Sequence, residues 1–533
     1  MLSDLQTDFS QEKIEADICI IGAGAAGITM AMDLIDKPWN VVVLEAGGTQ
    51  YNKETQNLFA GKNIGREYFD LLHERLRFLG GTTNHWGGWC APLAPIDLAK
   101  RSWVPLSGWP MSWEELEAYY PRAQELCQLG RYDYDPKSWL GDKLQLLDFE
   151  RELYEHYAYH FSPPTQFGRV YSAQLKKAKN INVIMHANVV DMVCNDGVSH
   201  MQTVQAQTLS GKRLSVSAKT FVLASGGIET ARLLLATNKQ NAKGLANDND
   251  LVGRYFMEHL EGIVGHIQKD NPNDARWLNS YSKRVVDGQN VQLMSAARLS
   301  ATAQEKLQVL NVGHSFRSEI DQNTGYLSAK RLALTALGRK KQSSYLQDMG
   351  YILGDLDEIA RWVYHRSQGT NYQFPVTNEP AAIWAYVEQE PNPSSRITLI
   401  EEKDALGMPR IALDWRVTAL EKRTISESSK HVAQEISRLT GMRVQLDEWV
   451  LAKDDFISDA MHGGHHHMGT TRMSDTAQTG VVDKDCKVFG IDNLFIASSS
   501  VFPTSGYANP TLTIVALASR LAGHLDQLLV KQS

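Results

Sequence analysis

The apolar positions near the start of the chain follow the pattern of a β-α-β unit. Residues 17–21 form a short run rich in β-branched residues, typical of a buried strand, and glycines follow it directly. The apolar sequence ITMAMDLI then predicts a helix, and WNVVVLEAG predicts a second strand that ends at Glu45. Elements in this order build a parallel sheet covered by helices, so the chain is expected to begin in an α/β fold.

The turn between the first strand and the helix carries the spacing G-x-G-x-x-G. Gly22 permits the tight turn, Gly24 lets the backbone approach a pyrophosphate, and Gly27 lets the helix pack closely on the strand. The helix N-terminus offers N–H groups to an anion, and Glu45 can accept hydrogen bonds from ribose hydroxyls. We therefore predict a dinucleotide site. A carboxylate at the ribose would repel a 2′-phosphate, so a phosphorylated dinucleotide such as NADP is not expected. The β-α-β unit alone does not distinguish NAD from FAD.

Later apolar runs predict that other segments complete this sheet and that a second domain follows. Residues 180–190 and 217–227 have strand patterns, and the second run ends in glycines before the apolar helix IETARLLLAT. These strands can rejoin the first sheet, with the backbone near Val189 contacting an adenine edge. Residues 262–455 differ, because strand-like runs such as AAIWAYVEQE and SRITLI are separated by polar loops before a long helix at 419–439. They predict a second, sheet-based domain.

Residues 77–92, RFLGGTTNHWGGWCAP, form a glycine-dense loop with many hydrogen-bonding side chains. Such a loop lets backbone pass close to something flat or charged. The simpler alternative is a structural loop that buries Trp86 and Trp89 in a core.

Two other stretches predict helices whose roles are structural. Ser112 and Glu115 have the spacing of a capping box at a helix start. Residues 329–341 form a basic amphipathic stretch. A helix with a solvated face is the more common meaning of such a pattern, and contact with an anionic membrane surface is the alternative.

The C-terminal sequence HGGHHHMGTTRM, residues 462–473, raises a choice between a metal site and acid–base chemistry. A metal site needs convergent ligands, usually with a carboxylate or thiol, and nothing in the sequence sets that geometry for the nearby aspartates. In an extended segment, His465 and His467 would face away from His466. We therefore predict no metal site here.

Composition and charge narrow the class of protein. A chain of 533 residues, 43% of them hydrophobic, is expected to form two or more domains. A net charge of −7 offers no broad basic surface, so we predict no nucleic-acid partner. The five cysteines include no CxxC pair, which argues against a zinc ribbon or an iron–sulfur cluster.

The sequence also predicts no membrane-spanning segment. The first 15 residues are polar and acidic, without a basic n-region or an apolar h-region, and no apolar run has membrane-spanning length. Free thiols favour a reducing compartment. We expect a cytoplasmic location, with export alongside a signal-bearing partner as the alternative.

Near its end the chain has a predicted strand, NLFIAS, then a loop to Asn509 and Pro510, and a regular helix from Thr511. An Asn N-cap with Pro at the first helical position is a strong helix-start signal. With these residues in place, the chain resembles the glucose–methanol–choline (GMC) oxidoreductases, which are FAD enzymes. Three blocks carry the resemblance, in the family's order: IGAGAAG, GGTTNHWGG, and HHHMGTTRM with SVFPTSGYANPTLT.

Within that family the chain is most similar to the sugar-oxidising branch, the pyranose oxidases and the large subunits of bacterial sugar dehydrogenases. Their H-x-x-G-T and ANPTLT endings are similar to those found here. The resemblance implies an α/β fold with a discontinuous, Rossmann-like FAD-binding domain and an α+β substrate-binding domain with an antiparallel sheet. It assigns residues 1–95, 170–261 and 456–533 to the first domain, and residues 96–169 and 262–455 to the second domain and its cap.

The resemblance also implies site residues. The catalytic histidine would be His466, three positions before the Gly469-Thr470 pair, with Asn509 where other branches often have a second histidine. His85, in N-H-W, matches a histidine that pyranose oxidases bond covalently to the flavin; other relatives need not have this bond, so both forms stay open. The implied FAD contacts are Gly22, Gly24, Gly27, Glu45, Ala46, Gly81, Thr83, Asn84, His85, Val189, Ala497, Asn509, Pro510 and Thr511.

The chemistry expected of such an enzyme suits these residues. FAD accepts a hydride from the alcohol carbon at N5, and the protein must accept the hydroxyl proton. The neutral imidazole of His466 can do so, and the amide of Asn509 can donate to the developing alkoxide. We expect oxidation of a secondary or anomeric hydroxyl of a sugar or glycoside. A non-sugar alcohol, or a non-redox flavin lyase of the same fold, is the alternative.

The electron acceptor and the assembly stay open at this stage. Some sugar dehydrogenases of the family have clustered cysteines before the adenine-contacting strand, but the corresponding region here, FSPPTQFGRVYSAQLKKAKN, has none. Dioxygen, a quinone or a redox protein is therefore expected to reoxidise the flavin. The sequence leaves a partner subunit or a homo-oligomer open.

Overall fold

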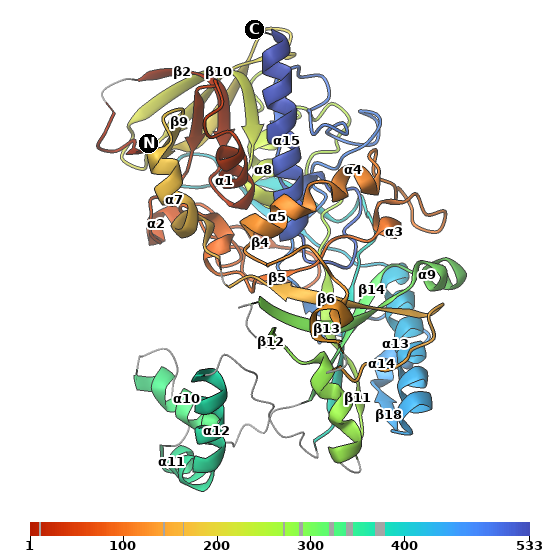
Figure 1. Ribbon diagram of the computed structural model, residues 1–533. Coiled ribbons are helices and arrows are strands. Elements are labelled where there is room, and N and C mark those ends of the chain that lie inside the picture. Colours follow the sequence, from red (N-terminus) through yellow and green to blue (C-terminus); the bar gives the residue numbers. More distant parts are fainter. Residues whose placement is uncertain are drawn as a thin grey trace.

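The computed structural model of the protein describes residues 1–533 except 10–11, 142–143, 164, 270–271, 287–290, 319–324, 337–344, 368–378 and 533. Figure 1 shows two sheet-containing parts, one above the other, with both chain ends in the upper part. A separate group of helices, α10 (Gly325–Ala336), α11 (Tyr345–Gly354) and α12 (Leu356–Ser367), lies at the lower left.

The first sheet is built from both ends and the middle of the chain. It is parallel from β1 through β2 to β10 and β20, and the antiparallel strands β9 and β8 extend it. This order confirms the predicted α/β class. Along the sheet the strands are β1 (Leu2–Asp4), β7 (Ile181–Met185), β3 (Val41–Leu44), β2 (Lys13–Ile21), β10 (Arg213–Leu223), β9 (Met201–Gln207) and β8 (Asn188–Cys194), with β20 (Leu494–Ile496) beside β10.

Helices from distant segments pack around this sheet. Helix α1 (Ala25–Asp33) contacts both α7 (Phe167–Lys177) and α15 (Thr511–Gln532), so the first and last helices of the domain lie side by side (Figure 1). Helix α8 (Gly226–Ala236) contacts β8 and a small sheet of β16 (Arg396–Lys403), β17 (Pro409–Asp414) and β4 (Lys62–Asn63). The predicted strand SRITLI therefore lies in this small sheet, against α8.

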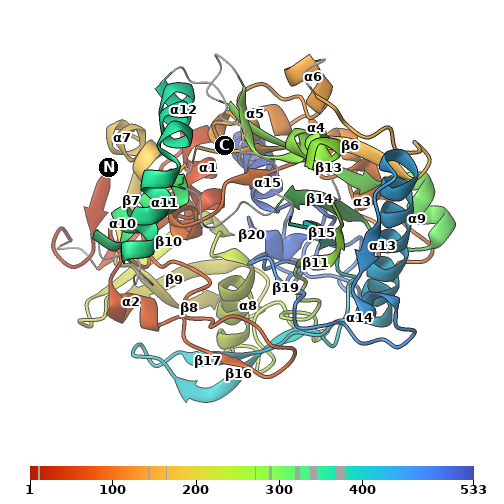
Figure 2. The same cartoon turned by 90° about the horizontal axis from the view of Figure 1, so that it is seen from below.

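The second sheet is antiparallel at each strand pair, as expected for the substrate-binding part. Helix α13 (Ala419–Thr440), close to the predicted 419–439, packs beside β14 and β15 (Figure 2). The strands in order are β18 (Val444–Leu446), β11 (Leu260–Ile267), β15 (Ala381–Val387), β14 (Val312–Ser318), β13 (Val291–Leu299), β6 (Tyr154–Phe161) and β5 (Trp89–Cys90), with β12 (Arg284–Val286) on β13 and β19 (His462–Gly463) on β11.

The predicted capping box is confirmed, but the helix it begins is short. The backbone N–H of Glu115 donates to Ser112 Oγ at 3.2 Å, and the N–H of Ser112 donates to Glu115 Oε2 at 2.9 Å. Helix α4 (Trp113–Glu117) ends before α5 (Tyr120–Leu126), because Pro121 starts a new helix. Helix α5 packs on α15, so part of the segment predicted as cap lies against the first domain.

The remaining helices are short connectors: α2 (Lys53–Asn57), α3 (Pro95–Leu98), α6 (Pro136–Leu140), α9 (Ala301–Leu307), α14 (Glu448–Leu451), and the 3₁₀ turns η1 (Gly81–Asn84), η3 (Pro272–Tyr281) and η4 (Ser499–Val501). Of the basic stretch at 329–341, residues 329–336 lie in α10, and residues 337–341 lie outside the described residues. Within the described ranges, each helix is too short or too polar to cross a bilayer.

Candidate active site

The glycine turn between β2 and α1 is shaped by close backbone contacts. Gly22 has φ of +108°, and a Cβ there would lie 2.6 Å from the carbonyl oxygen of Ala224. A Cβ on Gly27 would lie 1.9 Å from the carbonyl oxygen of Gly22. At Gly24, by contrast, a Cβ would meet no heavy atom within 4 Å. The turn is therefore tight on its inner side and open at Gly24, which fits the approach of a pyrophosphate.

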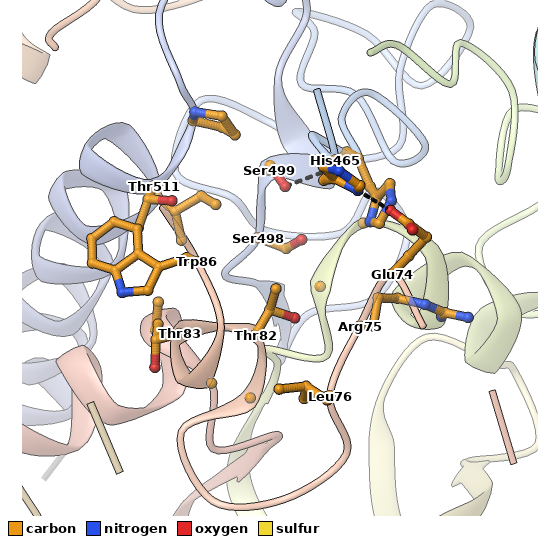
Figure 3. A pocket seen from close by; sticks show the side chains of 18 of the residues that line it. Glu74, Arg75, Leu76, Thr82, Thr83, Trp86, His465, Ser498, Ser499 and Thr511 are labelled. Atoms are coloured by element: carbon orange, nitrogen blue, oxygen red, sulfur yellow. Dashed lines mark hydrogen bonds and ion pairs between the residues drawn. The ribbon is translucent and has the colours of Figure 1, made fainter. Parts of the chain in front are cut away.

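A cavity of about 720 Å³ is lined both by this turn and by residues of the second sheet. In Figure 3, Trp86 and Thr511 line one part of it, and Glu74 and His465 line the opposite part. Most of the predicted contacts line this cavity: Gly22, Gly24, Glu45, Ala46, Gly81, Thr83, His85, Val189, Ala497, Asn509, Pro510 and Thr511, together with His466.

Gly27 and Asn84, two of the predicted contacts, are not among the residues that line the cavity. Gly27 packs against the strand, as its position in the motif requires. The amide of Asn84 folds back and donates to the carbonyl oxygens of Leu79 at 3.1 Å and Gly81 at 2.8 Å. Asn84 therefore shapes the loop that carries its neighbours.

Glu45 joins the end of β3 to the glycine turn. Its buried carboxylate accepts the backbone N–H of Ala23 and the backbone N–H of Gly47, each at 2.9 Å. Burial raises the pKa of Glu45, and these N–H groups oppose that effect. Each oxygen keeps a second lone pair, so the residue can still accept a ribose hydroxyl at the cavity wall.

The two predicted catalytic side chains meet, although they are far apart in sequence. His466 Nε2 lies 3.0 Å from Asn509 Nδ2. On the other side of the ring, His466 Nδ1 lies 2.9 Å from His259 Nδ1. Burial, and then the neighbouring His259, lower the pKa of His466 well below its ordinary value. His466 is therefore neutral near pH 7 and able to accept a proton.

The other histidines of the cluster each have a separate partner. His465 pairs with Glu74, a hydrogen bond that raises the pKa of His465, and His467 Nε2 lies 3.0 Å from Tyr68 Oη. The expectation of an extended segment is wrong at His465, where φ is +63° and the chain turns. Among the described residues, His, Cys, Asp and Glu side chains form no group of three or more that could hold a cation.

A buried carboxylate, Glu258, ties these parts together and was missed from the sequence. It accepts the backbone N–H of His466 at 2.6 Å, the backbone N–H of His259 at 3.0 Å, and the hydroxyl of Tyr68. Burial raises the pKa of Glu258 to about 7. Glu258 lies just before β11. The surrounding sequence has no regular spacing of apolar residues and no run of acidic residues or histidines that would indicate its role.

The second sheet supplies an aromatic and charged wall to the cavity. Glu261 on β11, Arg317 on β14, and Trp384 and Tyr386 on β15 line it, and Trp89 of β5 joins them. The Arg317 guanidinium lies 4.3 Å from the centre of the Trp384 ring and donates to the Tyr386 hydroxyl. The alternation in AAIWAYV places Trp384 and Tyr386 on one face, but the sequence alone does not show which face meets the cavity.

Comparison with known proteins agrees with this arrangement. A family model described as "GMC oxidoreductase" matches residues 391–518, and one described as "FAD dependent oxidoreductase" matches residues 17–245. The fructose dehydrogenase large subunit of Gluconobacter japonicus is 24% identical, covering 96% of this chain and 98% of the relative. The 2-methyl-1,2-propanediol dehydrogenase of Mycolicibacterium austroafricanum is 22% identical, covering 96% and 95%.

A solved structure of formate oxidase from Aspergillus oryzae RIB40 superposes with a TM-score of 0.56 at 18% identity, covering 98% of this chain and 100% of that one. This likeness extends over both sheets and agrees with a Rossmann-like sheet joined to a separate antiparallel sheet.

Proposed function

We propose that the chain oxidises a secondary or anomeric hydroxyl of a sugar or glycoside. The proposal starts from its family and class: it is a GMC oxidoreductase, an FAD-dependent enzyme that acts on CH–OH groups. The observation that carries the proposal is the position of His466 and Asn509 in the same cavity as the wall of Glu261, Arg317 and Trp384.

His466 and Asn509 have complementary roles in this proposal. FAD, when bound, takes the hydride from the alcohol carbon. A bound hydroxyl would replace the Asn509 amide as the donor to Nε2 of the neutral His466 and leave its proton there, while the Asn509 N–H would donate to the hydroxyl oxygen as negative charge develops. The glycine turn at Gly24, the carboxylate of Glu45 and the residues Asn509 to Thr511 would hold the cofactor.

The wall of the cavity supports a polyhydroxylated substrate. Trp89 and Trp384 bring aromatic rings to this wall, a common feature of sites that contact apolar C–H groups, and Tyr386 adds a hydroxyl. Glu261 and Arg317 provide a carboxyl group and a guanidinium at the same wall. A pocket with a few convergent polar groups selects substrates by their hydroxyls, because a missing hydroxyl leaves these groups unpaired.

A panel of substrates tests the sugar assignment. Mixed anaerobically with native protein, sugars or glycosides are expected to bleach the flavin absorbance, with kcat/KM values about 10⁴-fold above simple aliphatic alcohols. The oxidised product identifies the hydroxyl. Bleaching by aliphatic or aryl alcohols but by no sugar would contradict the sugar assignment. The assignment to the oxidoreductases would still hold.

A non-sugar alcohol is the second candidate. The similarity to the 2-methyl-1,2-propanediol dehydrogenase supports it. That similarity covers 96% of this chain, the same share as the similarity to the fructose dehydrogenase large subunit. The same panel separates the two.

The reaction also needs an electron acceptor. The five cysteines are buried and unpaired, and the described residues hold no ligand cluster through which electrons could leave. We therefore propose that dioxygen, a quinone or a redox protein accepts them directly from the flavin.

His85 is proposed to bond covalently to the flavin. Its side chain lines the cavity, and burial lowers its pKa, which keeps the ring neutral and nucleophilic. Acid-precipitated wild-type protein is expected to be yellow, and a His85→Ala variant is expected to release its FAD into the supernatant. A colourless wild-type pellet would show that FAD is held without this bond.

A further inference from the structure

We propose that His259 is a positioning residue, which fixes the tautomer of His466 so that the lone pair of Nε2 is available to the substrate. This inference rests on the proposed role of His466 as the proton acceptor. It follows from a chain of three hydrogen bonds that runs from a backbone carbonyl to Asn509.

The chain of hydrogen bonds begins at the carbonyl of Gly506, three residues before Asn509. His259 Nε2 lies 2.8 Å from this oxygen. A carbonyl oxygen only accepts hydrogen bonds, so His259 Nε2 must carry a hydrogen. A backbone carbonyl in the loop that contains Asn509 therefore fixes which ring nitrogen of His259 carries the hydrogen.

The second step is that His259 carries only this one proton. The side chain is almost wholly buried, with 1% of the residue exposed. Burial lowers the pKa of His259 to about 4, against the opposing effect of the Gly506 carbonyl. The ring is therefore neutral near pH 7. Its Nδ1 atom has a lone pair and no hydrogen.

The third step passes from His259 to His466. The two Nδ1 atoms are 2.9 Å apart, which is hydrogen-bond distance, so one of them must donate. The planes of the rings are inclined at 72°, an edge-on contact and not a stack. Since His259 Nδ1 has no hydrogen, His466 Nδ1 is the donor. A neutral His466 then has a bare Nε2, the atom that lies 3.0 Å from the Asn509 amide nitrogen.

The opposite tautomer would be both unfavourable and inactive. With the hydrogen on His466 Nε2, two lone pairs would face each other between His466 and His259. An N–H group would also point at the Asn509 N–H group. In the tautomer fixed by His259, the substrate O–H bond breaks and an Nε2–H bond forms, while the electron pair stays on oxygen. The resulting imidazolium keeps its Nδ1–H bond to His259.

The tautomer of His466 can be read directly by ¹⁵N NMR of histidine-labelled protein. The chain has 16 histidines, so the His466 signals are assigned by their loss in a His466→Ala variant. We expect a protonated Nδ1 and an unprotonated Nε2 near pH 7. A protonated Nε2 with a bare Nδ1 would overturn the inference. This readout needs no substrate, so it stands even if no sugar bleaches the flavin.

Two variants of similar shape test the function of the contact. Leucine and asparagine have the same branching, but only asparagine keeps an acceptor near the His259 Nδ1 position. With whichever alcohol bleaches the native flavin, His259→Leu is expected to slow flavin reduction about 10–100-fold at saturating substrate, with KM almost unchanged. His259→Asn is expected to recover most of the rate. Equal losses in both variants, or a wild-type rate in the leucine variant, would overturn the proposal.

Discussion

Replacement of His466 by alanine is expected to slow flavin reduction by about 10²–10⁴-fold, the loss typical of a general acid–base group. His466 is the only member of its histidine cluster bonded to Asn509, and its lowered pKa keeps it neutral. FAD should stay bound, because the glycine turn and Glu45, which are proposed to hold it, are unchanged in this variant. Anaerobic stopped-flow absorbance measures the rate.

His465→Ala is the matched control for this experiment. His465 is the preceding residue in the same loop and lines the same cavity, but it pairs with Glu74. Its loss is expected to change the rate only a few-fold. Wild-type speed in the His466 variant would show that another group accepts the proton. Equal losses in both variants would point to a damaged loop.

Gly24→Val is expected to abolish tight FAD binding while the protein still folds. The backbone at Gly24 has φ of −84°, which any residue can adopt, and a Cβ there meets no protein atom within 4 Å. The new side chain therefore begins in open space at the cavity wall, where the pyrophosphate is proposed to lie. We expect affinity for FAD to fall at least about 100-fold, equivalent to roughly 2.8 kcal/mol.

The visible absorbance of the purified variant measures this loss, and circular dichroism checks the fold. Gly523→Val is the control, because Gly523 also has open space around its Cβ position but lies on α15 outside the cavity lining. The control should be as yellow as the wild type. A Gly24 variant with full flavin content would show that the cofactor does not cross this turn.

The parts of the molecule that depend on local sequence were largely predictable. The strand at 17–21 lies within β2, the helix after the glycines is α1, and α15 begins at Thr511 as the Asn509-Pro510 pair indicates. The meeting of His466 with Asn509 was expected from the family resemblance, since no periodicity links residues 43 positions apart.

The residues that the sequence did not reveal act through long-range contacts. His259 lies 207 positions from His466 in the chain, and its role depends on one carbonyl in another loop. Glu258 depends on backbone N–H groups, which every sequence has. The turn at His465 is also a tertiary effect, because a left-handed φ at a non-glycine residue has no local sequence signal here.

A crystal structure of the purified protein with its cofactor tests the central claim most directly. The account predicts FAD with its pyrophosphate over Gly24 and its isoalloxazine ring facing His466 Nε2 across a gap that one alcohol carbon and its hydroxyl would fill. A flavin ring seated away from His466, or a cavity that binds no FAD, would contradict it.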